Sequence, residues 1–200
     1  MNSITIPRRF LPLTAAVVML AAAAPWSPAD AAPCAAGALA EKAGTAFVSA
    51  AKSRSSSAFA GALRKHVDMR SVALFALGKY RKKLPKGNER EFVKLTSTYV
   101  ARTLTDFSKK FRASSVEAVR CRGTTIESKL NQLGGRPPQK VLWRIKGGRV
   151  SDVNVQNVWL AQLLRSNYAS VIKKGGGKIS ALFSHLGAAR GTVAKLDDTR

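Results

Sequence analysis

The chain has 200 residues, 46% of them hydrophobic, and a formal net charge of +23 at pH 7. This length and composition allow one sizeable core and exclude a disordered chain, a collagen-like rod and a coiled coil. A chain this basic is expected to meet polyanions.

The first predicted element is an export leader. Arg8 and Arg9 precede an apolar run over residues 10–24, and Ala29-Asp30-Ala31 supplies the small-x-small pattern of a signal-peptidase site. The run is shorter than the roughly 20 residues that span a membrane, so a cleaved leader over residues 1–31 is favoured over an anchor. Removal of two basic residues and one acidic residue leaves an exported protein of charge +22. Its polyanionic partners are then membrane surfaces, envelope polymers and acidic proteins, and nucleic acid is not expected.

Two cysteines, Cys34 and Cys121, remain after the leader, in a compartment that permits oxidation. They form either one disulfide, which would tie the N-terminus to a strand, or two buried thiols. A bridge of this span contributes on the order of 4 kcal/mol in the chain-entropy model.

Helical periodicity dominates the first half of the exported chain. An apolar stripe predicts one helix before a Ser-rich break at residues 53–57, and a second short helix follows the break. Next comes a nearly all-apolar helix that Asp68 can cap and Gly78 can end. Such a helix lies between layers or against an apolar ligand. A long helix with a broad apolar face is predicted from about Asn88 to Phe111.

The hydrophobic period then changes from 3.6 to 2. Residues 116–121 and 125–130 are predicted as two short strands, and residues 140–146 turn at Gly147-Gly148 into a returning strand over residues 149–156. Alternation gives the hairpin one dry face and one wet face. The side chains expected on the wet face are Arg144, Lys146, Asn154 and Gln156.

Helical pattern resumes at Val158, breaks at the glycines 175–177 and fades after Leu186. Helices, then four strands, then helices predict an α+β fold with helices on one face of a twisted four-stranded antiparallel sheet. Residues 32–190 are assigned to a single domain and residues 191–200 to a polar C-terminal tail.

Few residues offer catalytic chemistry. Only His66 and His185 titrate near neutral pH, and each is expected to be an ordinary surface or capping histidine. The segment Gly175-Gly176-Gly177-Lys178 fails the phosphate-loop pattern, because Ile179 stands where a metal-binding Ser or Thr is needed. Metal-site spacing is absent from the sequence as well, so we expect no enzyme, no metal and no cofactor.

Several motifs, taken in order, carry a family resemblance over about Ala40 to Leu186. They are Val67-Asp68-Met69-Arg70, the run Phe75-Ala76-Leu77-Gly78-Lys79-Tyr80, the segment Glu91-Phe92-Val93-Lys94-Leu95 with Tyr99, the strand from Val150 to Val155, and Ser166-Asn167-Tyr168 before Gly175-Gly176. In this order they resemble the MlaC family, also called the toluene-tolerance or Ttg2D family. Its members are periplasmic carriers that move phospholipid between the two membranes of Gram-negative bacteria and support the lipid asymmetry of the outer membrane.

The resemblance implies that the helices and the sheet enclose an apolar cavity for acyl chains. It implies a periplasmic monomer that binds a phospholipid, docks on an inner-membrane ABC lipid-transport complex and an outer-membrane lipoprotein complex, and touches membrane surfaces transiently. Basic side chains at residues 79–83 and 144–149 are expected to favour anionic headgroups, membrane surfaces or acidic docking surfaces. The residues expected to bind lipid are Leu74, Phe75, Leu77, Tyr99, Leu104, Trp143, Ile145, Val153, Val155, Leu164 and Tyr168.

This sequence departs from the family pattern at three places. Arg81 follows Tyr80 where a Trp is common, Gly148-Arg149-Val150 stands where a Trp precedes the last strand, and Asn157-Val158-Trp159 replaces a Gly-Val-Ser. These departures concern the ligand, so a carrier of hopanoid or another apolar lipid stays open. The apolar residues can also be ordinary core. In that case the protein would be a cavity-free binder of envelope polyanions, and a hydrolase is the least favoured reading.

Overall fold

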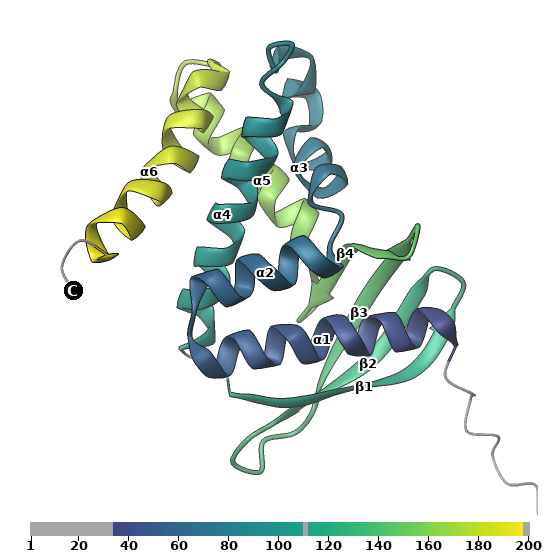
Figure 1. Ribbon diagram of the computed structural model, residues 1–200. Helices are drawn as coiled ribbons and strands as arrows, with labels where there is room; N and C mark the ends of the chain where they lie inside the picture. Colours follow the sequence, from purple (N-terminus) through teal and green to yellow (C-terminus); the bar gives the residue numbers. More distant parts are fainter. Residues whose placement is uncertain (1–33, 110–111, 198–200) are drawn as a thin grey trace, which may run out of the picture. The chain divides into compact units, whose positions relative to one another are not determined.

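A computed structural model describes residues 34–109 and 112–197 (Figure 1). In chain order these residues form α1 (Ala35–Ser53), α2 (Ser56–His66), α3 (Met69–Leu77), the 3₁₀ helix η1 (Gly78–Lys83), α4 (Glu89–Ser108), β1 (Ala113–Arg122), β2 (Thr125–Gln132), β3 (Gln139–Lys146), β4 (Arg149–Val155), β5 (Val158–Trp159), α5 (Leu160–Lys174) and α6 (Ile179–Asp197).

The α+β class is confirmed. The described sheet is antiparallel throughout, with strands in the order β1-β2-β3-β4-β5, so neighbours in sequence are neighbours in space. It has one strand more than predicted, because Val158 and Trp159 pair with β4 instead of starting a helix. The turn before them places Gln156 (φ 51°) and Asn157 (φ 66°) in the left-handed region, which returns the chain along β4.

Helix α1 lies across one face of the sheet, with α2 beside it (Figure 1). Its close approach to β1 depends on Gly44, because a Cβ there would lie 2.8 Å from the Val116 side chain. Cross-strand pairs put Ile126, Trp143 and Val153 on the covered face. The predicted dry face of the hairpin is therefore continuous from β2 to β4.

The predicted wet face is exposed only in part. Arg144 and Lys146 are exposed as expected, whereas Asn154 is only 5% exposed. Asn154 is paired with Trp159 of the unpredicted strand β5. The neighbouring Asp152 accepts, at Oδ1, the backbone N–H groups of Val153 (2.9 Å) and Ala161 (3.0 Å). Asp152 thus holds the start of α5 against this end of β4.

The helices that follow α2 in the chain, α3 to α6, pack on one another. Helix α3 contacts α4 and α5, α6 contacts α4 and α5, and both α3 and α5 touch β4. A parallel bridge between Val67 and Val150 joins the chain before α3 to the sheet, and the Asp68 N–H donates to the Val150 carbonyl oxygen at 2.8 Å. Helix and sheet layers therefore share one core.

Helix α3 begins and ends as the sequence predicts. Asp68 accepts the Ser71 N–H at Oδ1 (3.0 Å) and the Ser71 hydroxyl at Oδ2 (2.6 Å), and the hydroxyl bond above all lowers the pKa of Asp68. Gly78 ends the helix at φ +53°. A Cβ at Gly78 would lie 2.5 Å from Nε of Arg165, so a larger residue would require the arginine side chain to shift.

Side chains from α1 cover the outer edge of β1. Glu41 accepts the Ala118 N–H at 2.8 Å, and Lys52 donates to the Ser114 carbonyl oxygen at 3.3 Å. Pairing with β2 shifts register at two places along β1. At the opposite edge, β5 is only two residues long and leads directly into α5.

The predicted leader lies outside the described residues. Helix α6 continues to Asp197, into the segment for which a polar tail is predicted. Within residues 34–109 and 112–197, no helix combines the length and the hydropathy needed to cross a bilayer.

Candidate functional site

Ten of the eleven predicted lipid-binding residues belong to one continuous hydrophobic cluster. Its sheet part is Trp143, Ile145, Val153 and Val155, and its helix part is Leu74, Leu77, Tyr99, Leu104, Leu164 and Tyr168. The structure therefore brings together residues that lie up to 94 positions apart (Leu74 and Tyr168). Phe75 is the residue that it separates from the others.

The sheet part is centred on Trp143, which is 4% exposed. Its indole Nε1 donates to the Ser128 hydroxyl at 2.8 Å, and that hydroxyl donates to the Val141 carbonyl oxygen at 3.4 Å. The indole ring stacks on Phe47 of α1, with ring centroids 6.5 Å apart. This packing satisfies the polar end of the indole and leaves its apolar body against α1.

Phe47 was not among the predicted site residues. Its place in the apolar stripe of the first helix was visible in the sequence, but nothing in the stripe indicated which strand residue it would meet. Phe47 also lies 6.3 Å from Phe59 of α2, so it joins both helices to the sheet. It is half-buried, as are Val153 and Val155 across the strands.

The helix part is centred on Tyr168, which is 1% exposed. Its hydroxyl donates to the Thr96 hydroxyl at 3.2 Å, and its ring meets Phe92 edge-on at 6.0 Å. Burial raises the pKa of the Tyr168 hydroxyl well above its usual range, so the side chain stays neutral. Leu77 and Leu164 are buried in the same cluster.

Tyr99 lies at the margin of the helix part and is half-buried. Its hydroxyl accepts a hydrogen bond from Nδ2 of Asn167 at 2.9 Å, and its ring lies 5.5 Å from the ring of His185. Both tyrosines of the predicted site therefore have partners on neighbouring helices. Their hydroxyl groups help to fix α4 against α5.

Phe75 points away from the cluster and is 48% exposed. The Arg165 guanidinium lies over its ring at 4.7 Å. Together with the close contact at Gly78, this pair fixes the end of α3 to α5. The sequence could not distinguish this face of α3 from the buried ones, because nearly every residue of the helix is apolar.

Several basic side chains serve the scaffold. Arg149 donates through Nη2 to the carbonyl oxygens of Arg64 (2.5 Å) and Val67 (2.8 Å) at the end of α2. Arg144 lies 3.8 Å over the Trp159 ring and 3.6 Å from the Asp152 carboxylate. These two arginines belong to the segment that was expected to favour anionic headgroups, membrane surfaces or acidic docking surfaces, and both contact the protein itself.

The titratable groups of the described region do not form a metal cluster. His66 lies at the end of α2, where partial burial, followed by the charges of Lys65 and Arg149, lowers its pKa. His185 contacts the Tyr99 ring. In the described region, the contacts found for the two histidines are with basic residues and with an aromatic ring, and not with a nucleophilic side chain.

A shallow cleft of about 190 Å³ opens on the other face of the sheet. It is smaller than the roughly 300–1,000 Å³ of most ligand pockets, and it contains none of the eleven predicted residues. Its lining residues are Gln139, Lys140, Leu142, Asn154, Gln156 and Asn157.

The cysteines form the disulfide that was one of the two alternatives. Cys34 bonds to Cys121, across a sequence separation of 87 residues, and so ties the start of α1 to β1. The Cys34 sulfur also accepts the Gly37 N–H at 3.2 Å and caps α1. The bridge fixes the helix that covers Trp143.

Comparisons with known proteins agree with this architecture. The MlaC protein family matches residues 43–188, from the middle of α1 into α6. A solved structure of a phospholipid-binding protein from Ralstonia solanacearum, in complex with a phospholipid, aligns with a TM-score of 0.65 at 17% identity, over 80% of this chain and 98% of that one. Comparison with curated proteins finds no match. Because the family match spans most of the chain, this protein belongs to the MlaC family.

Proposed function

We propose that this protein is a periplasmic lipid carrier that holds the acyl chains of a phospholipid between the inner face of the sheet and the helices α1 to α5. The observation that carries the proposal is the family match over residues 43–188. The shared fold with a phospholipid-binding protein that was solved with its phospholipid supports the same ligand class.

The energetics of such a carrier need no catalytic group. Shielding about fifteen methylenes from water is worth on the order of 12 kcal/mol, at about 0.8 kcal/mol for each CH₂. A bilayer supplies a similar benefit, so transfer between membrane and carrier is close to neutral. Direction then comes from the complexes on which the carrier docks. We propose an inner-membrane ABC complex and an outer-membrane lipoprotein complex for this role.

An acyl chain placed among the predicted binding residues would displace side-chain contacts, because six of the eleven residues are buried in one hydrophobic cluster. An acyl chain that enters replaces contacts between side chains with contacts to methylenes, which exchanges one apolar surface for another. The residues Val153, Val155, Tyr99 and Leu104 are half-buried and so are the more accessible members of the cluster. We therefore place the first acyl contacts at these residues and the deeper ones at Trp143.

The direct test is lipid extraction from protein purified from the periplasm of an expression host, followed by mass spectrometry. We expect phospholipid to co-purify and to exchange with labelled phospholipid in vesicles. Hopanoid in the extract would change the ligand class but keep the carrier. Absence of any bound or exchangeable lipid from the folded protein would reject the proposal.

A matched pair of variants tests the location. Val153→Asp puts a carboxylate on the inner face, where burial against acyl chains costs several kcal/mol, and should abolish lipid retention. Leu142→Asp makes the same kind of change on the opposite face of the same hairpin and should leave retention unchanged. Near-UV circular dichroism checks that both variants are folded. Equal lipid retention by the two folded variants would place the lipid elsewhere.

Salt separates the carrier from a binder of envelope polyanions. Retention of lipid in an apolar interior is not screened, so it should persist at high salt. Binding to polyanions through the charge of +22 should collapse, because a Debye length of about 10 Å at 0.1 M shrinks to about 3 Å at 1 M. Release of a lipid ester's products by the purified protein would instead revive the hydrolase.

A further inference from the structure

Two basic segments that are distant in the sequence meet at the end of α5. The first is η1 with the turn that follows it, and the second is the last turn of α5 with the link to α6. The Lys83 ammonium donates to the Gly177 carbonyl oxygen at 3.1 Å and so joins the two segments. We call their exposed cations the basic pole: Lys79, Arg81, Lys82, Lys83, Lys86, Lys173, Lys174 and Lys178.

The charge of the basic pole is not compensated. Neither segment contains an acidic residue, and none of the ion pairs within the described residues involves a cation of the pole. The nearest acid along the sequence, Glu89, is paired with Arg70 at 2.6 Å. Lys173 and Lys174 lie in the last turn of α5, where positive charge stabilises the helix dipole. These two cations therefore have a structural reason to be basic. Lys83 has one as well, in its hydrogen bond to the Gly177 carbonyl oxygen, and Arg81, Lys82 and Lys83 form the basic last turn of η1.

The composition of the pole favours phosphate headgroups over a protein surface. Its cations are lysines except for Arg81. Lysine is depleted in protein–protein interfaces and arginine is enriched there, because the planar guanidinium binds carboxylates in a fixed bidentate geometry. Mobile ammonium groups instead suit an anionic membrane, where each lysine contributes a similar binding free energy of about 1 kcal/mol.

Tyr80 adds an amphipathic side chain to the pole. It is half-buried, and its ring lies between two ammonium groups, 5.4 Å from Nζ of Lys79 and 5.7 Å from Nζ of Lys83. Tyrosine is enriched at membrane–water interfaces, where the ring meets the headgroup layer and the hydroxyl stays hydrated. A tyrosine among lysines is thus suited to the surface of a bilayer.

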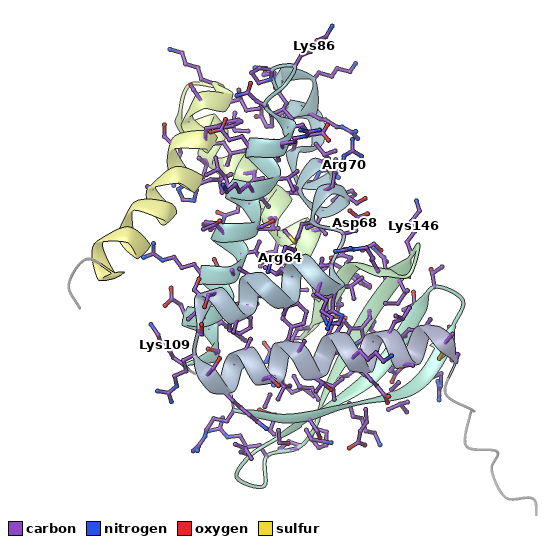
Figure 2. All side chains as sticks on the ribbon, viewed as in Figure 1. Arg64, Asp68, Arg70, Lys86, Lys109 and Lys146 are labelled. Carbon is purple, nitrogen blue, oxygen red and sulfur yellow. A yellow bond between two sulfur atoms is a disulfide. The ribbon has the colours of Figure 1, made fainter. Side chains whose placement is uncertain are left out.

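We propose that the basic pole docks the protein on the surface of an anionic phospholipid bilayer. The pole lies where α3 and α5 end, and these helices carry Leu77 and Tyr168 of the interior. Figure 2 shows Lys86 at this end of the molecule, far from Lys146 at the tip of the β3–β4 hairpin. The proposal goes beyond the carrier function. It rests on that function only in one respect, namely that a lipid carrier must approach a bilayer.

The test is flotation of the periplasmically purified protein with phosphatidylcholine vesicles that contain or lack phosphatidylglycerol. We expect binding only with phosphatidylglycerol and loss of binding at high salt. The variant Lys82→Gln/Lys86→Gln/Lys174→Gln/Lys178→Gln should weaken binding roughly fivefold for each lysine removed, and so more than about a hundredfold in all. Each of these four side chains is exposed, so folding should not change.

A charge-matched control removes four exposed cations from α1 and the sheet region: Lys42→Gln/Arg122→Gln/Lys129→Gln/Arg136→Gln. This control should bind vesicles like the unchanged protein. Equal weakening by both variants would mean a general charge effect and would overturn the pole. The proposal would also be overturned if the protein does not bind vesicles and the same lysines are instead required for binding to an acidic protein.

Lipid extraction from the same preparations keeps this test separate from that of the carrier. The pole variant should retain its lipid, because none of the four lysines belongs to the hydrophobic cluster. A pole variant that floats with vesicles as the unchanged protein does overturns the docking proposal even where lipid is retained. Lipid-free protein that still floats through its lysines supports docking and rejects the carrier.

Discussion

Replacing Asp152 by alanine should detach the start of α5 from the sheet. The Asp152 carboxylate is 7% exposed and accepts two backbone N–H groups, from Val153 and from the buried Ala161. Each amide left without an acceptor costs about 1–3 kcal/mol, so the variant should lose roughly 2–6 kcal/mol of unfolding free energy. Asp152→Asn keeps a carbonyl acceptor and should stay within about 1 kcal/mol of the unchanged protein.

The comparison of these two variants also has a pH dependence. Burial raises the pKa of Asp152, although the two amides and Arg144 oppose the rise. Because the pKa is higher in the folded state, the protonated carboxyl favours folding at low pH, and this contribution is lost as the pH rises through the folded-state pKa. Asparagine does not titrate. The unchanged protein should therefore lose stability relative to Asp152→Asn as the pH rises from about 4 toward neutrality.

Urea unfolding, followed by far-UV circular dichroism at several pH values, measures both effects. Hydrogen exchange at the first turn of α5 should rise in the alanine variant and not in the asparagine variant. An alanine variant as stable as the unchanged protein would refute the capping role. An asparagine variant as unstable as the alanine one would show that charge, and not the acceptor, holds α5.

Three further outcomes are expected. Reduction of the Cys34–Cys121 bridge should lower the unfolding free energy by up to about 4.5 kcal/mol, the chain-entropy value for its 87-residue separation, as read from urea midpoints with and without reductant. Gly78→Ala should cost about 1–3 kcal/mol from its left-handed backbone and a further amount from the arginine packed on it, whereas Gly87→Ala, with open space around it, should cost the backbone part alone. Trp143→Phe keeps the ring stack but loses the indole hydrogen bond, and thermal unfolding should register a loss of roughly 1–2 kcal/mol.

Local signals predicted some elements closely. Asp68 and Gly78 marked the ends of α3 because a cap acceptor and a left-handed residue act within a few residues of each other. The Gly147-Gly148 turn likewise marked the β3–β4 hairpin, since its two positive φ values need no tertiary contact. Chemistry confined to a few neighbouring residues was therefore readable from the sequence.

Features set by distant partners were not readable. Strand β5 is two residues long and exists because β4 pairs with it, which no local period could indicate. Phe75 and Leu77 look alike on an apolar helix, and only the positions of the neighbouring helices make one exposed and the other buried. The lysines at residues 173–178 lie next to those of η1 because Lys83 binds the Gly177 carbonyl oxygen, 94 positions later in the sequence.

The edges of the sheet affect the tendency of such a protein to aggregate. A carrier that opens its interior for every lipid exposes apolar surface repeatedly, and an open strand edge nearby would invite a second molecule to pair and start an aggregate. Glu41 and Lys52 occupy backbone groups along β1, and β5 is too short to serve as a template. Sheet extension is thus hindered at both edges, which would limit pairing between molecules if the interior opens to admit lipid.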